Sequence, residues 1–453
     1  MQQNSKIITR FAPSPTGLLH LGTFRTAIFA YLFAEKNNGK FILRIEDTDK
    51  QRSKKEYEDN ILEALEWLSL DYDEIYHQSK NLPRHKFFLE KLIEEGNAYI
   101  SREESKDGSG VMKEIVRFKN PNITITFHDE IKGSVTMDTT DLGDFVIAKS
   151  VDEPLFHLAV VVDDFDEGVT HIIRGEDHVS NTPRQVLIQR AIGAPTPVYA
   201  HLPLVLGPDK LKLSKRRGAL PVLDYRDRGF IPEAILNSTA MVGWNPGTDQ
   251  ELFDRDALIE SFDLAKVQKS PAVFNEEKLR WFNKEHLRSL PKDILRTKVL
   301  EFVPENIKSL ERFEELFDRV LPIIIERIET FGDVKVMAEA GELDYFFSNP
   351  SYSKDGLICP PKLRKDAPIT IDEINNHLKE VVSKLENVSE DNFTPESLKL
   401  ELWDYATQNG RGVVLWAMRF ALSGREKSPD PFIVASLIGK DESIKRLNHA
   451  ISL

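Results

Sequence analysis

The sequence predicts an α/β protein: a Rossmann-like domain built on a parallel sheet, with an inserted α+β subdomain, followed by a mostly helical carboxyl-terminal region. Three observations indicate this. Strand-like and helix-like segments alternate over the first hundred residues, a polar, glycine-bearing stretch interrupts them after residue 100, and the β pattern fades after about residue 240. Strands that alternate with helices favour a parallel sheet with right-handed crossovers.

The first elements follow from hydrophobic periodicity. Residues 6–12 form a short β-like run that ends at a turn rich in proline and glycine. A helical pattern begins at His20 and has Gly39 as a stop signal, and residues 41–45 form a second strand. Apolar residues between 57 and 68 then recur at helical spacing. The predicted order is strand, helix, strand, helix.

The middle of the chain reads as an insertion followed by the rest of the α/β domain. Residues 101–110 are polar, and residues 116–137 have the alternation of short antiparallel strands. Beyond the insertion, the pattern predicts strands at 144–148, 157–162, 169–173 and 202–206 and a helix at 183–192.

Composition excludes several classes of protein. The 453 residues, 41% of them apolar, suffice for roughly two to four domains, and no apolar run is long enough to cross a bilayer. The first residues have no signal-peptide pattern. The single cysteine, Cys359, excludes intramolecular disulfides and cysteine-rich zinc sites. The net charge of −13 argues against indiscriminate nucleic-acid binding, but not against an RNA that touches one basic face. We expect a cytoplasmic protein with no membrane partner.

The first motif with chemical content reads Pro13-Ser-Pro-Thr-Gly-Leu-Leu-His-Leu-Gly-Thr23 and lies between the first strand and the first helix. Ligands of such folds bind at this carboxyl edge of the sheet. His20 and Gly22 fall at the amino end of the helix, whose N–H groups and dipole favour phosphate. The alternative is an ordinary helix start with one surface histidine.

The second motif, Lys210-Leu-Lys-Leu-Ser-Lys-Arg-Arg217, has five basic residues in eight and follows a predicted strand and turn. A loop of this kind can wrap a triphosphate and stabilise charge that develops on the reacting phosphate. Taken alone, it also fits a solvated basic loop or a stretch that touches RNA phosphate.

The third feature is a pair of apolar strands that each end in charges, Arg44-Ile-Glu-Asp-Thr-Asp49 and Ile173-Arg-Gly-Glu-Asp-His178. Carboxylates there can hold an ammonium group, and an arginine can bind a carboxylate in bidentate fashion. Salt bridging at strand ends, which contributes little, is the alternative.

Together, the first two motifs resemble the paired signatures of class I aminoacyl-tRNA synthetases, in which a His-x-Gly-His-like motif and a Lys-Met-Ser-Lys-Ser-like motif flank one ATP. Here they read His20-Leu-Gly-Thr23 and Lys212-Leu-Ser-Lys-Arg216, about 190 residues apart. The neighbouring segments are similar to those of the bacterial glutamyl-tRNA synthetase family: Arg10-Phe-Ala-Pro-Ser-Pro-Thr-Gly17, Arg44-Ile-Glu-Asp-Thr-Asp49, Arg174-Gly-Glu-Asp-His178 and Asn181-Thr-Pro-Arg-Gln185.

The resemblance covers roughly nine tenths of the chain, through Gly243-Trp-Asn-Pro-Gly247, Lys278-Leu-Arg-Trp-Phe-Asn283 and Ala421-Leu-Ser-Gly-Arg425. It implies a Rossmann-like catalytic domain in two halves, 1–98 and 144–240, the second of which carries the Lys-Leu-Ser-Lys-Arg loop. A shortened acceptor-end-binding subdomain at 99–143 separates them. A helical stem-contact region at 241–310 and a helical anticodon-binding region at 311–453 follow.

The chain departs from the family pattern at two places. After Ala98-Tyr99, where relatives often carry a zinc-binding cysteine cluster, it reads Ile100-Ser-Arg-Glu-Glu, so we expect no zinc. Where the family tends to have Thr-Tyr, it has Leu155-Phe156, so a tyrosine hydroxyl of the amino-acid pocket is missing.

The resemblance implies ATP-dependent ligation of L-glutamate to tRNA(Glu) through glutamyl-adenylate, with release of diphosphate and AMP. It implies Mg²⁺ bound with ATP, no other metal, and a monomeric enzyme. The catalytic residues would be His20, Lys212 and Lys215. The ATP-binding residues would be Pro13, His20, Gly22, Thr23, Lys212, Ser214 and Lys215. Glutamate would be bound by Glu46 through its ammonium group, by Arg10 and Arg174 through its carboxylates, and by Ser14, Phe156 and His178.

Three alternatives stay open at this point. The enzyme would be non-discriminating if it also charged tRNA(Gln) with glutamate. A small-molecule adenylyltransferase or ligase would use the same ATP site without RNA, but would leave the helical last third without a role. A non-catalytic tRNA-binding protein would not need His20, Lys212 and Lys215 together.

Overall fold

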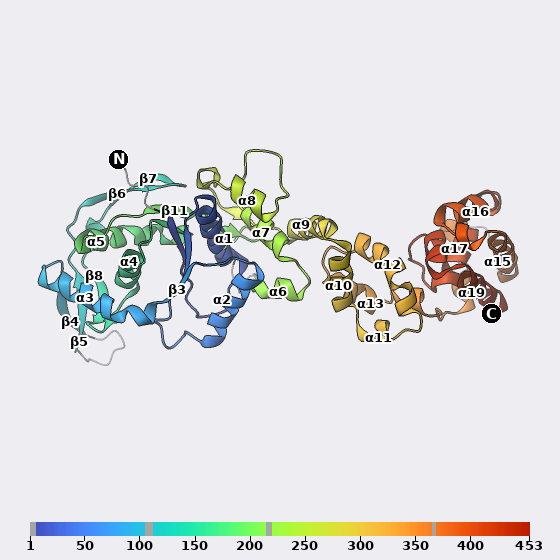
Figure 1. The fold of residues 1–453 in the computed structure, drawn as a ribbon, viewed down its shortest axis with the longest axis horizontal. Helices are drawn as coiled ribbons and strands as arrows, with labels where there is room; N and C mark the ends of the chain where they lie inside the picture. The colour runs from blue at the N-terminus through green and yellow to red at the C-terminus, as the bar shows by residue number, and fades with distance from the viewer. Residues whose placement is uncertain (1–5, 105–111, 214–219, 365–367) are drawn as a thin grey trace. The chain divides into compact units, whose positions relative to one another are not determined.

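The computed structural model describes residues 6–104, 112–213, 220–364 and 368–453. Two of the predicted site residues, Ser214 and Lys215, lie outside these segments. The chain divides into two compact units, the first ending at residue 286 and the second covering residues 287–453 (Figure 1). The predicted site belongs to the first unit.

The first unit contains the predicted parallel sheet. Strands β1 (Ile8–Phe11), β2 (Lys40–Ile45) and β3 (Glu74–His77) pair in parallel. β10 (His171–Gly175) and β11 (Val198–Leu202) form a second parallel pair. The backbone N–H of Thr170 donates to the carbonyl of Ile8 (3.0 Å), which joins the two groups edge to edge. Helices α1 (Leu21–Lys36) and α2 (Lys55–Trp67) follow β1 and β2, so the predicted alternation is confirmed (Figure 1).

Apolar side chains cover both faces of this sheet. Leu43 and Ile45 of β2 are buried in one core with Phe24 of α1. Ile42, which precedes Leu43, belongs to a second core that includes side chains of helices α4 (Phe156–Asp166) and α5 (Thr182–Ile192). Successive side chains of a strand point to opposite faces, so a continuous apolar run is what a sheet covered on both sides requires.

The predicted insertion forms antiparallel strands, and one of its sheets extends past the expected end at residue 143, so the strand predicted at 144–148 belongs to this sheet and not to the parallel one. β4 (Ala98–Glu104), β5 (Met112–Phe118), β8 (Phe145–Ser150) and β9 (Glu153–Pro154) make one sheet. β6 (Thr124–Asp129) pairs with β7 (Gly133–Asp138), and its last residue, Asp129, also pairs with Tyr199 of β11. The inserted chain is therefore connected directly to the parallel pair that follows it in sequence.

One predicted strand is a helix. Residues 157–162 lie in α4, and Leu158, Ala159, Val160, Val161 and Val162 are all buried there. A helix buried on every side carries no polar face, so its sequence shows no helical period and reads like a buried strand. The prediction of a strand was wrong for this reason. The correction matters because Asp164, in the same helix, accepts a hydrogen bond from the predicted site residue Arg10.

The remaining elements of the first unit are short. Its last helix, α9 (Glu276–Ser289), crosses the boundary between the units. The others are η1 (Gln78–Asn81), α3 (Leu82–Glu94), η2 (Thr140–Leu142), η3 (Glu176–Asn181), β12 (Val205–Leu206), α6 (Val222–Asp227), α7 (Pro232–Ala240), α8 (Arg255–Ser261), η5 (Leu264–Lys266) and β13 (Ala272–Val273).

The second unit is built from helices. Its α-helices are α10 (Lys292–Phe302), α11 (Glu305–Lys308), α12 (Phe313–Arg327), α13 (Gly332–Glu339), α14 (Asp344–Phe347), α15 (Ile371–Glu386), α16 (Pro395–Asn409), α17 (Arg411–Ser423), α18 (Pro431–Ile438) and α19 (Lys440–Ser452). The buried Arg446 of α19 donates to the carbonyl oxygens of Tyr345 (2.6 Å) and Leu422 (2.8 Å) and so connects three helices. Among the helices in the described segments, none has the length and apolarity needed to cross a membrane.

Candidate functional site

One cavity of about 440 Å³ in the first unit collects the predicted site residues. It lies at the carboxyl ends of β1, β2 and β10, where ligands bind in sheets of this kind. Every predicted site residue within the described segments lines it: Arg10, Pro13, Ser14, His20, Gly22, Thr23, Glu46, Phe156, Arg174, His178 and Lys212. Segments as far apart in sequence as residues 10 and 212 therefore meet at one place.

His20 is the N-cap of α1. The backbone N–H of Thr23 donates to its Nδ1 (3.3 Å), so the imidazole is held over the first turn of the helix. A Cβ atom on Gly22 would lie only 3.1 Å from that Nδ1, so a larger residue there would press on the ring. The spacing His-x-Gly thus places an imidazole beside open backbone at a helix amino end, an arrangement suited to phosphate.

The two sequence motifs are adjacent in space. The backbone N–H of Val222 donates to the carbonyl of Leu19 (3.0 Å), and His20 forms a backbone bridge with Pro221. On the other side, the N–H of Leu213 donates to the carbonyl of Val205 in β12 (2.9 Å). Leu213, the last described residue of the basic motif, is therefore anchored at the cavity wall, and residues 221–222, which follow the motif, are anchored against the first motif.

Lys212 reaches into this cavity and forms an ion pair with Asp177 (Nζ to Oδ2, 3.3 Å). Both side chains are more than half exposed, at 57% and 51%. Exposed pairs of this kind contribute little free energy. A phosphate that enters the cavity can therefore replace Asp177 as the partner of Lys212 with little loss of free energy.

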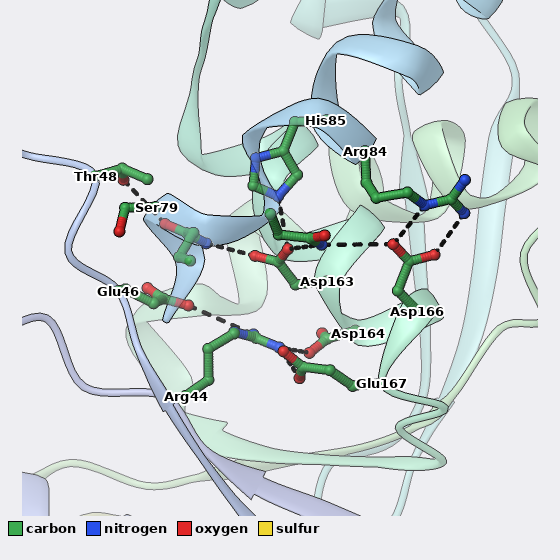
Figure 2. Close-up of polar contacts among 12 residues, drawn as sticks. Arg44, Glu46, Thr48, Ser79, Arg84, His85, Asp163, Asp164, Asp166 and Glu167 are labelled. Atoms are coloured by element: carbon green, nitrogen blue, oxygen red, sulfur yellow. Dashed lines mark hydrogen bonds and ion pairs between the residues drawn. The ribbon is translucent and has the colours of Figure 1, made fainter. Parts of the chain in front are cut away.

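Arg10 belongs to a buried ionic network. Its Nε donates to Oδ1 of Asp164 (3.1 Å), which also accepts from Nη1 of Arg44 (2.8 Å). Figure 2 shows Arg44 of β2 reaching Asp164 of α4 and Glu167, the residue that follows this helix. The carboxylates around Arg44 outweigh the effect of its burial and raise its pKa well above the usual value. Removing one member of such a network leaves a buried charge unpaired, so the network fixes where Arg10 points.

Glu46 sits at the edge of the same network. Nη2 of Arg44 lies 3.4 Å from its Oε1, at the long end of hydrogen-bond distance. Burial raises the pKa of Glu46, although Arg44 and Arg10 act in the opposite direction. A substrate ammonium placed against this carboxylate would stabilise its charged form. Its position in the cavity fits the predicted ammonium contact.

Arg174 is the second buried guanidinium of the cavity. It lies at the end of β10, is 7% exposed, and donates from Nη2 to the hydroxyl of Thr182 (2.8 Å). Within the described residues it forms no ion pair with a carboxylate. Burial lowers the pKa of Arg174 to about 10, so it is still charged at neutral pH. A carboxylate ligand would supply the missing counter-charge.

Phe156 forms part of the wall beside two histidines. Its ring centroid lies 5.7 Å from that of His178 and 5.4 Å from that of His157, and the side chain is 38% exposed. Burial lowers the pKa of each histidine to about 4, with a further decrease from nearby arginines, so both rings are neutral at physiological pH. This part of the wall is therefore largely uncharged.

The missing hydroxyl at Phe156 leads to a prediction of modest size. Phe156→Tyr should tighten glutamate binding by roughly threefold to tenfold, because one neutral hydrogen bond contributes about 0.5–1.5 kcal/mol. If a bound water already makes that contact, affinity should stay unchanged. The measurement is glutamate affinity of both forms at saturating ATP and tRNA. A large loss of activity would mean that the space beside the ring is filled, and would contradict the assigned pocket.

No three His, Cys, Asp or Glu side chains of the described segments are grouped so that they could hold a metal ion. The single Cys359 is buried in the second unit. The absence of zinc stays a prediction. We expect purified protein to contain no stoichiometric zinc and to keep full activity after chelation once Mg²⁺ is restored. One zinc per chain by elemental analysis would contradict it.

The sequence motifs did not identify several residues that border the site. Asp164, which orients Arg10, lies in none of the motifs, and Asp177, which pairs with Lys212, lies in the third motif but was given no role. The fully buried His201 accepts a hydrogen bond from Arg174. Residues 163–167, four of which are acidic, are a visible signal in the sequence. Their contact with the site follows only from the structure, in which residues 157–162 are helical. We find no sequence signal for His201.

Comparison with known proteins gives matches over both units. The family described as "tRNA synthetases class I (E and Q), catalytic domain" matches residues 6–107 and 100–281. The family described as "Anticodon binding domain" matches residues 294–451.

Similar proteins cover almost the whole chain. The glutamate–tRNA ligase of Aquifex aeolicus is 41% identical over 84% of this chain and 90% of its own. That of Lawsonia intracellularis is 39% identical over 98% of both chains. Among solved structures, a glutamate tRNA ligase from Elizabethkingia meningosepticum in complex with its amino acid superposes with a TM-score of 0.86, at 30% identity and 99% coverage of both chains.

Proposed function

Because the chain belongs to the class I tRNA synthetase family of glutamate and glutamine enzymes, we propose that its cavity activates L-glutamate with ATP and transfers it to the 3′ end of a tRNA. One observation carries the proposal. The nucleotide motif at the start of α1 and two buried arginines line a single cavity, which offers a phosphate-favouring helix end beside two groups that can bind carboxylates. The relatives named glutamate–tRNA ligase extend over nearly the full chain.

In the first step, an oxygen of the glutamate α-carboxylate attacks the α-phosphorus of ATP. The new P–O bond forms as the bond to the bridging oxygen of the β-phosphate breaks, which yields glutamyl-adenylate and diphosphate. Lys212 and Lys215 stabilise the negative charge on the phosphate oxygens, and His20 with the amides at Gly22 and Thr23 holds the nucleotide. Catalysis of this kind rests on positioning and electrostatics, so it needs no protein nucleophile.

In the second step, a ribose hydroxyl of the terminal adenosine of the tRNA attacks the activated carbonyl. The ester bond forms as the bond between the carbonyl carbon and the phosphate oxygen of the adenylate breaks. AMP leaves, and the proton of the ribose hydroxyl passes to solvent. The leaving group is already activated, so correct placement of the hydroxyl is the main requirement.

The amino-acid subsite suits a substrate with two carboxylates and one ammonium group. Arg10 and Arg174 supply two guanidinium groups, and Glu46 supplies one carboxylate. Both arginines are buried, at 4% and 7% exposure, where a charge left without a partner is costly. Glutamine would leave one guanidinium unpaired, so this pocket favours glutamate.

The remaining segments take their proposed roles from the family. Residues 99–143 contact the acceptor end, 241–310 the stem, and 311–453 the anticodon region of the tRNA. Mg²⁺ enters with ATP, since this ion keeps several waters and binds mainly through substrate phosphates. The enzyme acts as a monomer in the cytoplasm. Charging of tRNA(Gln) in addition to tRNA(Glu) is the alternative specificity.

Glutamate-dependent ATP–pyrophosphate exchange tests the proposal. Exchange that requires both glutamate and tRNA(Glu) is the expected result. Exchange with a small molecule and no dependence on tRNA would favour the small-molecule ligase instead. Binding of tRNA without any exchange would favour a non-catalytic RNA-binding protein.

A further inference from the structure

Arg174 contacts a buried histidine that does not line the cavity. Nε of Arg174 donates to Nε2 of His201 (3.0 Å). His201 is fully buried, and its ring stacks on that of Tyr199 with centroids 5.8 Å apart and an interplanar angle of 8°. The guanidinium of Arg174 also lies over the Tyr199 ring, at 5.4 Å. The arginine is thus held by one hydrogen bond and one aromatic surface.

The other nitrogen of His201 contacts an equally buried carboxylate, Asp129 (Nδ1 to Oδ2, 2.6 Å). Because Nε2 accepts from Arg174, the ring proton is on Nδ1 and is donated to Asp129. The imidazole is therefore fixed as the Nδ1–H tautomer. It donates to the carboxylate of Asp129 through Nδ1 and accepts from the guanidinium of Arg174 through Nε2.

Asp129 is itself firmly oriented. Its Oδ1 accepts from the backbone N–H groups of Ile131 (3.0 Å) and Lys132 (2.7 Å), and its Oδ2 from that of His201 (3.1 Å). Burial acts to raise the pKa of Asp129, but His201 and the backbone donors outweigh burial and lower it, so the carboxylate stays ionised. Asp129 is the last residue of β6, in the inserted segment.

A second contact fixes the remaining rotation of Arg174. Its Nη2 donates to the hydroxyl of Thr182 (2.8 Å), which in turn donates to the carbonyl of His178 (3.1 Å). With Nε and Nη2 both engaged on the protein side, the guanidinium has one orientation, and it lines the cavity in that orientation. Preorganisation of this kind is what separates a selective pocket from a merely charged one.

We propose that Asp129 and His201 are positioning residues that hold Arg174 in the orientation needed to bind the substrate carboxylate. The inserted segment then contributes to the choice of amino acid through Asp129, in addition to any contact with RNA. This inference rests on the proposed function, since it takes Arg174 as a carboxylate-binding residue.

Asp129→Asn tests the proposal without a change in volume. Asparagine has only one oxygen, and when that oxygen accepts from the backbone N–H groups of Ile131 and Lys132, its NH₂ group faces Nδ1 of His201 and drives the ring to the Nε2–H tautomer. That tautomer cannot accept from Arg174. We expect KM for glutamate in ATP–pyrophosphate exchange to rise roughly tenfold or more, with discrimination against glutamine reduced and KM for ATP within about threefold of wild type.

His85→Gln is the matched control. His85 and Asp163 form another buried pair with the same 2.6 Å separation, but His85 does not line the cavity. This variant should leave the glutamate-to-glutamine ratio unchanged. If Asp129→Asn does not fold, Thr182→Val removes the second contact on Arg174, and the same two constants and the same ratio are measured.

The outcomes are distinct. A rise in KM for glutamate with loss of selectivity supports the proposal. Unchanged KM and selectivity in a folded variant, or an equal loss with both substrates and with ATP, would overturn it in favour of a purely structural role. Wild-type protein that activates no glutamate would instead contradict the proposed function.

Discussion

Arg174→Ala is expected to reduce kcat/KM for glutamate activation by on the order of a hundredfold or more. The side chain is a buried cation without a carboxylate partner among the described residues, and losing one member of a buried charge pair costs about 3–5 kcal/mol. Activation of glutamine should fall far less, because glutamine does not gain from the charge. ATP binding should change little. Parallel pyrophosphate-exchange titrations of glutamate, glutamine and ATP measure all three.

Arg84→Ala provides a matched arginine control. Arg84 pairs with Asp166 of α4 (Figure 2), the helix whose Asp164 binds Arg10 and Arg44. Arg84 is exposed and does not line the cavity. The loss of activity on removal of such a surface pair should be small.

Arg10→Ala should act in the same direction as Arg174→Ala. Near-normal glutamate affinity and selectivity in both Arg10→Ala and Arg174→Ala would show that the pocket is wrongly assigned.

Lys215→Ala should lower the rate of glutamate activation by roughly a hundredfold or more, as the loss of a preorganised electrostatic donor does in other enzymes. Glutamate binding should change little, since the charge that Lys215 stabilises appears on the phosphates during the reaction. Single-turnover formation of the adenylate in the presence of tRNA measures the step directly.

Lys210→Ala separates chemistry from surface charge. Lys210 begins the same basic motif but lies outside the segment that resembles the family signature. Its removal should change activation by no more than a few-fold. If the Lys215 and Lys210 variants show the same small effect, the motif is a solvated basic loop and not part of the catalytic site.

Much of the fold could be predicted because its signals are local. The strand at 41–45 is apolar except for Arg44, and it became β2 with side chains in both cores. His20 and Gly22 occur at the start of a helical pattern, and His20 caps α1. The prediction for 157–162 was wrong because residues 158–162 are all buried and apolar, so no helical period distinguishes this segment from a strand.

The candidate site was only partly predictable for a different reason. Residues that face a ligand lie in recognisable motifs, but the residues that orient them come from other elements. Asp164 and Arg10 are 154 positions apart, and Asp129 and His201 are 72 apart. Nothing in the neighbourhood of Asp129 marks it as a partner of a histidine on β11. Such contacts follow from the sheet topology, which pairs Asp129 with Tyr199.

Aminoacylation of purified tRNA tests the proposed reaction most directly. The enzyme is incubated with ATP, Mg²⁺ and labelled glutamate, together with tRNA(Glu) or tRNA(Gln), and base-labile label on the RNA is counted. We expect glutamate to be esterified to tRNA(Glu), and label on tRNA(Gln) would identify a non-discriminating enzyme. A folded protein that transfers glutamate to neither tRNA would contradict the proposed function.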